Sequence, residues 1–379
     1  MAIQCKTRRA LVLGRGASGE AAAEELRRRG YDVDFAEDLA LVVASPGVPV
    51  KSELQLGCEE LRRRGWKMLA VTGSKGKSSV VKVVADTLAL AGLRAVPCGN
   101  YGRPVCDLVK EDEPGWAVVE VSSFQLETTQ LAAGTFEAAV VLNVQEEHLD
   151  RHGDMSVYHS LKHRLASMSR VCLEGWEANS PGKLEAVDCF AGFRALIADS
   201  YFDNDVLRAN GAYAVALMRA AGLSDEQIRR GFESFAPLPH RFQTVAEVGG
   251  VRYVDDSKAT SIAALVAGIT MCGASPVRLI AGGLPKGDDP KNALPILTDR
   301  GKKVYLIGQS AEVFSSAWSG AVDCEVCGTL ERAVGAAMRD AVRGETVLLS
   351  PGAASFDQFT SFGERGEVFA SLVKKGKKE

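Results

Sequence analysis

The chain has 379 residues, which predicts two or three domains at the usual size of about 100 to 200 residues each. Its hydrophobic fraction of 46% and charged fraction of 25% are typical of an ordinary soluble globular protein with a sizeable core. A net charge of −3 gives no basic field for nucleic acid, and the apolar runs are too short or too charged for a signal peptide or a membrane span.

The cysteines and the arginine runs suggest no chemistry of their own. Nine cysteines, an odd number, are scattered through apolar segments, which predicts reduced thiols in the cytoplasm rather than a disulfide framework. Cys324 and Cys327 form a lone C-x-x-C without a second pair nearby, so metal or redox chemistry is not expected there. The arginine runs at residues 27–29 and 62–64 are interpreted as solvated ends of two helices, where cations suit the helix dipole.

The first module, residues 1–66, begins as a βαβ unit. A strand, a G-x-G-x-x-G turn at residues 14–19, a helix and a second strand are predicted over residues 10–35. Glu37 and Asp38 lie about 20 residues past the glycines, the spacing of the ribose-binding acid in the dinucleotide fingerprint. NAD is therefore one interpretation, but the module is too short for both mononucleotide halves. A half-fold that holds one nucleotide or diphosphate fits better.

A third strand is predicted over residues 41–44, and it ends in Ser45, Pro46 and Gly47. Ligands of open parallel sheets bind at the carboxyl ends of the strands, which makes this turn a candidate binding segment. Serine, proline and glycine also form ordinary turns, so a turn without a ligand stays an alternative.

Residues 72–79 read TGSKGKSS and lie between an apolar strand at 68–71 and a predicted helix at 80–91. The glycines let backbone N–H groups turn toward an anion, Lys77 adds a point charge, and the Ser78 hydroxyl suits Mg²⁺. The match is a shortened phosphate loop, and alone it could be a lysine-bearing turn. The strand before it and the helix after it favour a site for a nucleoside triphosphate.

Two further apolar segments of the central module, 116–121 and 138–144, are continuous rather than alternating, as buried parallel strands are. Glu120 stands inside the first, where a buried carboxylate needs a cation or hydrogen-bond donors. Beside a phosphate loop, Mg²⁺ explains it, and backbone donors are the alternative. His148 follows the second strand as a metal ligand or a surface histidine. Lys162 lies on a predicted helix, where nothing local distinguishes it from a solvated lysine.

A proline-rich linker at Pro237 and Pro239 separates the central module, residues 67–236, from a third module, residues 237–379. Arg241, just after the linker, can reach a phosphate or form a hinge salt bridge. The third module alternates strands and helices without a phosphate loop of its own, so its ligand is expected to be a substrate rather than a second nucleotide. Small or charged clusters follow each of its predicted strands, at 251–254, 277–281, 303–307 and 346–349.

The chain resembles the Mur ligases along nearly its whole length. Four segments carry the resemblance in the family's order: EVSSFQLE at 120–127, LNVQEEHLDR at 142–151, DSKAT at 256–260, and LSPGAASFDQF at 349–359. Several separate motifs in the right order are far more specific than any one of them. The resemblance implies an α/β protein of three domains: a short Rossmann-like N-terminal domain, a central phosphate-loop ATPase domain with a parallel sheet, and a Rossmann-like C-terminal domain.

The resemblance implies a cytoplasmic, monomeric enzyme whose partners are small molecules. In the family, ATP phosphorylates a substrate carboxylate and an amine attacks the acyl phosphate, while Mg²⁺ and lysines neutralise the charge. The implied reaction joins D-glutamate to UDP-N-acetylmuramoyl-L-alanine and yields ADP and phosphate for peptidoglycan. Another Mur or folylpolyglutamate-type ligase is the alternative enzyme, and residues 355–359 argue against it. An inactive nucleotide-binding homologue is the other alternative, which the complete set of charged side chains disfavours.

The resemblance also implies roles for individual residues. For ATP it indicates Gly73, Ser74, Lys75, Gly76, Lys77, Ser78, Ser79, Asn210, Arg241 and Asp256. For the UDP-sugar it indicates Ala17, Ser18, Ser45, Pro46, Gly47, Asn100, Ser122 and Gln125. For D-glutamate it indicates Thr260, Lys286, Ser355, Phe356 and Phe362. As ligands of two Mg²⁺ ions it indicates Ser78, Glu120, His148 and a carbamylated Lys162. The catalytic residues are Lys77, His148, Lys162 and Lys258. A lysine that takes up CO₂ must be partly neutral, so its pKa must be lowered.

The sequence departs from the family's pattern at several places. Lys75 stands where the family usually has Asn, and Ser261 replaces an Asn after Ala-Thr. The adenine-side motif keeps only Asn210, because apolar residues fill its first two places. The N-terminal module and the stretch after residue 171 are short. The acid that binds the uracil is therefore Glu37, Asp38 or absent from this chain.

Overall fold

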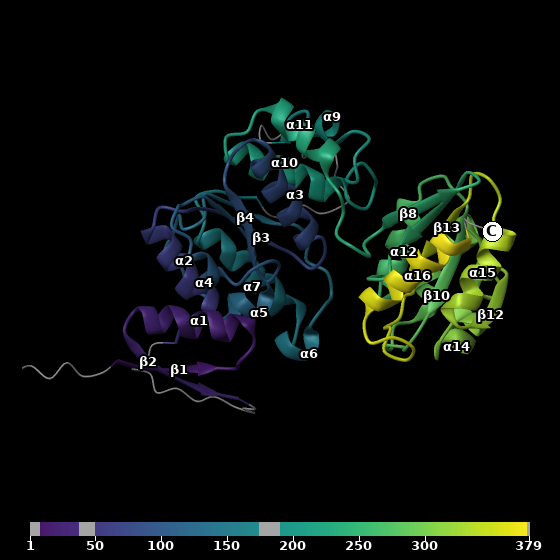
Figure 1. Cartoon of the computed structure of the whole chain (residues 1–379), viewed down its shortest axis with the longest axis horizontal. Coiled ribbons are helices and arrows are strands. Elements are labelled where there is room, and N and C mark those ends of the chain that lie inside the picture. Colours follow the sequence, from purple (N-terminus) through teal and green to yellow (C-terminus); the bar gives the residue numbers. More distant parts are fainter. Residues whose placement is uncertain (1–7, 38–49, 174–189, 377–379) are drawn as a thin grey trace, which may run out of the picture. The chain divides into compact units, whose positions relative to one another are not determined.

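The computed structural model describes residues 8–37, 50–173 and 190–376 (Figure 1). The chain forms two compact units, one of Met1–Asp203 with Leu207–Phe235, the other of Asn204–Val206 with Ala236–Glu379. The predicted strand at 41–44 lies outside the described residues, as do the candidates Asp38, Ser45, Pro46 and Gly47. Among the residues described, no helix has the length and apolar character needed to cross a membrane.

The first unit begins with the predicted βαβ arrangement. Strands β1 (Arg8–Leu13) and β2 (Tyr31–Ala36) pair in parallel through helix α1 (Ala17–Arg28). Alanines of α1 pack against helices α2 (Glu53–Arg63) and α4 (Val105–Leu108). The short N-terminal module therefore joins the central module in one compact unit.

The central sheet has five parallel strands in the order β4-β5-β3-β6-β7. The predicted buried strands are confirmed as β3 (Lys67–Thr72), β5 (Trp116–Glu120) and β6 (Ala138–Val141). The sequence did not predict β4 (Ala95–Gly99), because it contains Pro97. Proline lacks a donor for the ladder, and β4 lies at the edge of the sheet, where this is tolerated. Strand β7 (Cys172–Leu173) closes the other side.

Helices cover this sheet in two groups (Figure 1). Side chains of α2, α4, α5 (Ser123–Thr128) and α7 (Met155–Ser167) share one apolar core with β3, β5 and β6. Helix α3 (Lys77–Leu90) contacts the strands and packs against α10 (Arg208–Ala220) and α11 (Asp225–Ser234). The short helices α6 (Leu149–His152) and α9 (Phe193–Ile197) complete the unit.

The second unit is a six-stranded sheet in the order β12-β11-β10-β13-β9-β8. Five strands are parallel, and the edge strand β8 (Gln243–Val248) is antiparallel to β9 (Val251–Asp255), which the sequence did not predict. The remaining strands are β10 (Val277–Gly282), β11 (Gly301–Ile307), β12 (Cys324–Gly328) and β13 (Thr346–Leu349). The C-x-x-C pair lies on β12 as free thiols.

Two separate apolar cores lie on the two faces of this sheet. One includes side chains of α12 (Ile262–Met271), η2 (Pro290–Ala293), α13 (Leu294–Arg300) and α14 (Ala311–Trp318). The other includes α15 (Leu330–Asp340) and α16 (Phe362–Gly376). The doubly wound α/β architecture predicted for this part is confirmed. The division into three domains at residues 66 and 236 stays a prediction.

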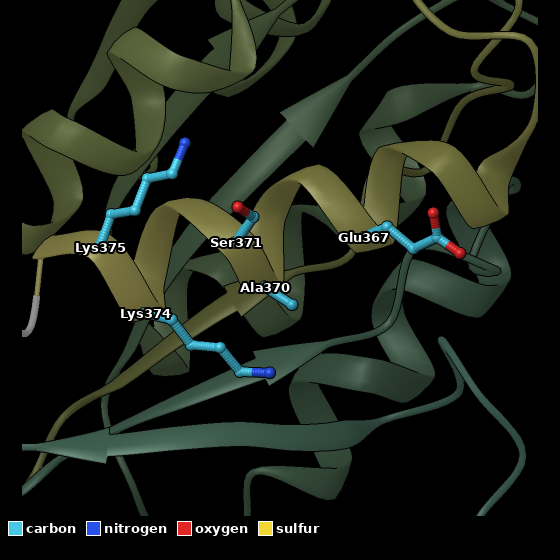
Figure 2. A pocket seen from close by; sticks show the side chains of 5 residues that line it. All are labelled: Glu367, Ala370, Ser371, Lys374 and Lys375. Atoms are coloured by element: carbon cyan, nitrogen blue, oxygen red, sulfur yellow. The ribbon is translucent and has the colours of Figure 1, made fainter.

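Helix α16 carries a shallow surface pocket lined by Glu367, Ala370, Ser371, Lys374 and Lys375 (Figure 2). All five lining residues come from successive turns of this one helix. None belongs to a strand end or to a predicted site. We therefore assign this pocket no role in binding.

Candidate active site

The phosphate loop lies between β3 and α3, as predicted. Gly76 has a φ of +87°, and a Cβ added there would lie 2.2 Å from Asn210 Nδ2. Glycine is therefore favoured at this position by its backbone angle, and a larger residue would also have to displace the Asn210 amide. Gly73 also has a positive φ, +150°, where the chain leaves the strand. The structure brings Asn210, a predicted nucleotide contact, directly against the loop.

Lys77 is the first residue of α3, and its side chain folds back over the loop. Its Nζ donates to the carbonyl oxygens of Gly73 at 2.8 Å and Ser74 at 3.0 Å. The N-terminal end of α3 and this ammonium make the loop a site for an anion. Ser78 is half-buried beside Lys77, whereas Ser79 is buried in the helix core.

Ser74 is buried and connects the loop to two other elements. Its N–H donates to the carbonyl oxygen of Asn143 at 2.9 Å, and its hydroxyl lies 3.0 Å from the Tyr158 hydroxyl on α7. The N–H of Gln145 also donates to the Ser74 hydroxyl, at 3.0 Å. These bonds hold the loop against the segment after β6, and an ATP contact by Ser74 stays a prediction.

Lys75, which the sequence left unexplained, pairs with Glu147. The Nζ to Oε1 distance is 2.7 Å, and the Lys75 N–H donates to Asn143 Oδ1 at 2.8 Å. The Asn143 amide in turn donates to the Lys75 carbonyl at 3.0 Å. Lys75 therefore ties the phosphate loop to the segment that carries His148.

Glu120 ends strand β5 and is 2% exposed. It pairs in register with Val71, the residue before the loop begins at Thr72. Its Oε1 accepts a hydrogen bond from Asn100 Nδ2 at 2.7 Å, but its Oε2 has no hydrogen-bond partner among the described residues. A buried carboxylate oxygen without a donor is unfavourable unless a cation meets it. The donor found on this carboxylate is a side-chain amide rather than a backbone N–H, and a role for Glu120 in Mg²⁺ binding stays a prediction.

The donor set around this oxygen fits Mg²⁺. Mg²⁺ is usually held by one or two carboxylates, water and substrate phosphates rather than by a complete protein cage. Within the described ranges, no group of three or more His, Cys, Asp or Glu side chains converges as a metal site. Glu120 beside a phosphate loop agrees with an ion that is shared with a nucleotide.

Lys162 lies on α7 and is 1% exposed, so it is not a solvated helix lysine. Burial and the nearby charge of Lys77 lower its pKa to about 7, against an opposing contribution from Glu147. Its Nζ lies 4.4 Å from the centre of the Tyr158 ring. A lysine with this pKa is neutral in a large fraction of molecules at neutral pH, which is what carbamylation requires.

His148 stands just before the short helix α6, with a φ of +58°. Such a backbone angle is uncommon outside glycine and is found most often at functional sites. The ring is half-exposed, and its centre lies 4.9 Å from that of Phe124. An accessible imidazole in this position can serve as a metal ligand.

The UDP-sugar candidates lie at two helix starts. Ala17 and Ser18 are exposed in the first turn of α1. Ser122 and Gln125 form a capping box at α5, where the Gln125 N–H donates to the Ser122 hydroxyl at 3.2 Å and the Ser122 N–H donates to Gln125 Oε1 at 2.9 Å. Asn100 is engaged by Glu120, so its predicted sugar contact stays a prediction.

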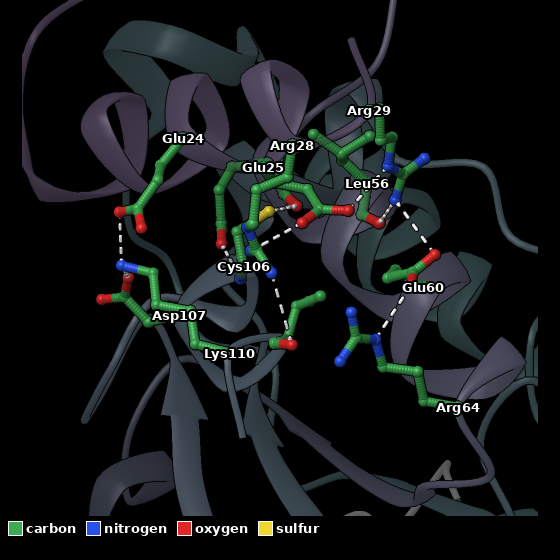
Figure 3. Close-up of polar contacts among 12 residues, drawn as sticks. Glu24, Glu25, Arg28, Arg29, Leu56, Glu60, Arg64, Cys106, Asp107 and Lys110 are labelled. Carbon is green, nitrogen blue, oxygen red and sulfur yellow. Dashed lines mark hydrogen bonds and ion pairs between the residues drawn. The ribbon is translucent and has the colours of Figure 1, made fainter. Parts of the chain in front are cut away.

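A charged cluster holds α1 against the central module (Figure 3). Buried Glu25 pairs with Arg28 at 2.6 Å and Arg29 at 2.7 Å, and Arg29 Nη2 also lies 3.6 Å from Glu60 Oε2 on α2. Glu60 pairs as well with Arg64, at 2.9 Å. The interpretation of both arginine runs as solvated is therefore wrong in part, because two acidic residues on neighbouring helices bind them.

The D-glutamate candidates lie in the second unit, where three loops meet at the carboxyl ends of the strands. Lys286 Nζ donates to Thr260 Oγ1 at 3.0 Å. Leu284 and Ala354 form an antiparallel bridge with N–H to carbonyl distances of 2.8 and 3.0 Å. The bridge brings the loop of Lys286 to the loop of Ser355, which is buried.

The aromatic candidates differ in exposure. Phe362 lies under Lys258, whose Nζ is 3.9 Å from the ring centre, whereas Phe356 is 70% exposed. Partial burial, followed by the charges of Arg241 and Lys286, lowers the pKa of Lys258. The positive charges of Arg241 and Lys286 therefore both act on Lys258.

Comparison with known proteins identifies the family. The Mur ligase middle domain family matches residues 71–172. A UDP-N-acetylmuramoylalanine--D-glutamate ligase of Nitratidesulfovibrio vulgaris (strain DP4) is 35% identical and aligns with 96% of this chain and 95% of its own length. The protein of the same name from Gloeobacter violaceus is 37% identical, over 89% of this chain and 85% of its own. The chain belongs to the UDP-N-acetylmuramoylalanine--D-glutamate ligases, a branch of the Mur ligase family.

Solved structures of Mur ligases share the fold. MurF ligase from Thermotoga maritima, in complex with ADP, matches with a TM-score of 0.62 over 98% of this chain and 96% of its own, at 15% identity. MurC from Thermotoga maritima matches with a TM-score of 0.61 over 97% and 99%, at 14% identity. These likenesses confirm the multi-domain α/β architecture.

Two of the Mur ligase motifs are joined by a residue that the sequence did not single out. Arg365 on α16 is 1% exposed and donates to the Ser257 hydroxyl at 3.0 Å and the Ser257 carbonyl at 2.9 Å. It also donates to the carbonyl oxygens of Ala353 at 3.2 Å and Ala354 at 3.3 Å. Burial lowers its pKa to about 10. In the sequence, the signal for Arg365 was its place on the apolar face of the helix, in line with Phe369 and Val373.

The remaining Mur ligase nucleotide candidates fall in different units. Asn210 belongs to the first unit, and Arg241 and Asp256 belong to the second. Asp256 accepts from the Ser350 hydroxyl at 3.0 Å and from the Phe242 N–H at 3.1 Å, and burial raises its pKa to about 7. Their joint contact with adenosine stays a prediction.

Proposed function

We propose that this protein joins D-glutamate to UDP-N-acetylmuramoyl-L-alanine with ATP, releasing ADP and phosphate, in peptidoglycan synthesis. The observation that carries the proposal is the position of Glu120. Its unpartnered oxygen lies beside the start of the phosphate loop, where an ion shared with a nucleotide belongs. The names of the relatives support the substrates.

The metal positions follow from the donors present. Ser78 and Glu120 would hold one Mg²⁺, and His148 with carbamylated Lys162 would hold a second. When bound, these ions neutralise charge on the phosphates of ATP. The carbamate forms when the neutral Lys162 amine attacks CO₂ and releases a proton, which converts a buried cation into an anion. Because the charge of the side chain changes from positive to negative, Lys162 can then bind a metal ion, which a protonated lysine cannot do.

The chain's cations would act in two steps. In the first, a carboxylate oxygen of the UDP-sugar attacks the γ-phosphorus and ADP leaves, while Lys77 exchanges its bonds to the loop carbonyls for bonds to the phosphates. In the second, the deprotonated amine of D-glutamate attacks the acyl carbon and phosphate leaves. Lys258 would stabilise the negative charge that develops on the tetrahedral carbon's oxygen.

Substrate contacts complete the proposal. The first turn of α1, with Ala17 and Ser18, would bind the diphosphate of the UDP-sugar through its free N–H groups. Asn100, Ser122, Gln125 and the turn at 45–47 are the other sugar contacts that we propose. Lys286 would pair with a carboxylate of D-glutamate, beside Thr260, Ser355, Phe356 and Phe362. Adenosine would contact Asn210, Arg241 and Asp256.

Further proposals concern the whole protein. We propose domains at residues 1–66 for the UDP-sugar, 67–236 for ATP and 237–379 for the amino acid. We also propose a cytoplasmic monomer, because its substrates are cytoplasmic small molecules and its described cysteines are free thiols.

The test is phosphate release in the presence of Mg·ATP. We expect release only when UDP-N-acetylmuramoyl-L-alanine and D-glutamate are both present. A panel of other amino acids, including L-glutamate and a diamino acid, separates this reaction from those of other ligases in the superfamily. Release that ignores D-glutamate but depends on another amino acid would contradict the substrate. Nucleotide binding without release under any combination would indicate an inactive homologue.

A further inference from the structure

A buried histidine that has no role in the proposed reaction lies within the first unit. His152 ends helix α6, and its side chain is 0% exposed. Its Nε2 lies 3.0 Å from the hydroxyl of Ser123, the first residue of α5. Its Nδ1 lies 3.1 Å from Glu127 Oε1, close enough to pair but not aligned as a hydrogen bond, and no other described residue offers it an aligned partner. We call these three residues the histidine bridge.

The carboxylate of the bridge is itself fixed. Arg151 Nη2 donates to Glu127 Oε2 at 2.8 Å, and Arg151 Nε donates to Oε1 at 3.3 Å. Because Arg151 and His152 are neighbours on α6, both side chains hold the same carboxylate on α5. Two adjacent residues of one short helix therefore fasten it to a second helix.

The bridge connects two parts of the proposed site. Helix α5 begins with the capping box of Ser122 and Gln125, which are sugar candidates. Helix α6 begins after His148, a metal candidate, whose carbonyl accepts from the N–H groups of Arg151 at 3.1 Å and His152 at 2.9 Å. A helix of four residues is not stable alone, so the strained backbone at His148 depends on what holds the other end of α6.

Stacked rings extend the connection to the phosphate loop. His152 stacks on Tyr158 with ring centres 5.3 Å apart at 28°, and Phe124 lies 5.3 Å from His152 and 4.9 Å from His148. The Tyr158 hydroxyl lies 3.0 Å from that of Ser74, and the Tyr158 ring lies under Lys162. Movement of His152 would therefore disturb His148, Lys162 and the loop together.

Serine, histidine and glutamate in series also form the triads of hydrolases. A nucleophilic serine must be reached by a substrate carbonyl, and here both Ser123 and His152 are buried. The Ser123 hydroxyl belongs to the first turn of α5 and faces the buried His152 ring. The arrangement can position other residues, but it cannot act as a nucleophile.

We propose that Ser123, His152 and Glu127 are positioning residues that set the sugar-binding end of α5 against the metal-binding segment at His148. This inference rests on the proposed function for the identity of the ligands. Loss of the bridge should weaken UDP-sugar binding and metal binding together. The D-glutamate candidates lie in the second unit and the bridge lies in the first, so binding of D-glutamate should be spared.

The test uses Glu127→Gln, His152→Ala and His152→Gln in the full chain, with Thr135→Val as the control. Thr135 is also a buried polar residue of the first unit, but it precedes β6 and lies at the opposite end of the strands. Direct titrations measure Kd for UDP-N-acetylmuramoyl-L-alanine and, with ATP present, for Mn²⁺ as a probe of the metal site. Steady-state assays add the KM for D-glutamate.

We expect His152→Ala to raise the Kd for the UDP-sugar and the Kd for Mn²⁺ about tenfold each, which is the effect of losing one or two hydrogen bonds. His152→Gln, which keeps a donor near Ser123, should recover part of the loss. The KM for D-glutamate and all constants of Thr135→Val should stay within about twofold. Equal losses in every constant, or no change in the two Kd values, would overturn the proposal.

Two features keep the result decisive. If His152→Ala does not fold, the nearly isosteric Glu127→Gln still removes the charge that holds Arg151 and His152, and thermal unfolding confirms that it is folded. The two titrations need no turnover. A wild-type chain that binds UDP-sugar and Mn²⁺ but ignores D-glutamate would therefore contradict the proposed function while the bridge is still tested.

Discussion

The Asn100 amide donates to Oε1 of Glu120 at 2.7 Å, whereas Oε2 of the same buried carboxylate has no partner in the described part of the chain. One donor orients the group, and the other oxygen stays available. An ionised carboxylate in this setting destabilises the fold until a cation reaches it. Asn100 is thus placed to orient the Glu120 carboxylate, in addition to the sugar contact that we propose for it.

The first prediction concerns Glu120→Gln. The change should lower kcat by about a hundredfold, because one ligand of the proposed ion is lost. It should also remove the additional stabilisation that Mg²⁺ gives to the wild-type chain in the presence of ADP. Urea unfolding in ADP, with and without Mg²⁺, measures this difference. The exposed change Asp86→Asn on α3 is the control. Equal Mg²⁺ stabilisation of the Glu120→Gln and wild-type chains would contradict the assignment.

The second prediction concerns the charge of Lys162. Its pKa is about 7 in the folded chain against an ordinary 10.5, so the unfolded chain binds more protons between these values. The penalty of the buried ammonium is therefore complete below pH 7 and disappears as pH rises toward 10.5. In CO₂-free buffer, Lys162→Met should be more stable than wild type at pH about 6, and the difference should shrink at higher pH.

Lys67→Met, an exposed lysine change in the same unit, is the control for that comparison. The neutral amine should take up CO₂ more readily at pH about 8 than at pH about 6, since its neutral fraction rises through the pKa. A carbamate signal from ¹³C-bicarbonate in NMR, absent in Lys162→Met, measures this. Full activity in Lys162→Ala would exclude a carbamate role.

The third prediction concerns Gly76. Alanine there would combine a positive φ with a contact of 2.2 Å to Asn210, so Gly76→Ala should abolish ATP binding and lower the free energy of unfolding by about 2 kcal/mol or more. Gly92→Ala is a matched control, because Gly92 has a φ of +83° but a Cβ added there would meet no atom of the described residues within 4 Å. It should cost about 1 kcal/mol and spare ATP binding. Equal effects of the two changes on ATP affinity would show that the contact with Asn210 is unimportant.

The fourth prediction concerns Arg365. Lysine cannot reproduce its five hydrogen bonds to the two loops, so Arg365→Lys should raise the KM for D-glutamate about tenfold or more. The Kd for the UDP-sugar, whose candidates lie in the first unit, should not change. Arg332→Lys, an exposed change on α15, should alter neither value. A larger effect on UDP-sugar binding than on D-glutamate would contradict this role for Arg365.

The fold was largely predictable because its signals are local. Continuous apolar segments predicted β3, β5 and β6, and the glycine, lysine and serine pattern predicted the phosphate loop. Strand β4 was missed because Pro97 argues against a strand wherever its place at the edge is unknown. In the arginine runs, Glu25 and Glu60 bind arginines three or four residues away on their own helices, a spacing that the sequence itself contains. The contact of Arg29 with Glu60, by contrast, joins two helices that are far apart in sequence.

The site was predictable in its residues but not in its connections. Glu120 was conspicuous, since a carboxylate within an apolar strand needs an explanation. The buried state of Lys162, the pair of Lys75 with Glu147 and the histidine bridge depend on contacts between distant segments. The hydrophobic periodicity of a sequence carries no information about such contacts. Arg365 was missed for the same reason, because its four acceptors lie in two other loops.

Transfer of labelled oxygen tests the central claim most directly. UDP-N-acetylmuramoyl-L-alanine carrying ¹⁸O in its alanine carboxylate should be incubated with Mg·ATP and D-glutamate. If a carboxylate oxygen attacks the γ-phosphorus and the amine then displaces phosphate, one ¹⁸O must leave with each phosphate. Mass spectrometry should find singly labelled phosphate in amounts equal to the peptide formed. Unlabelled phosphate, or phosphate released without D-glutamate, would contradict the account.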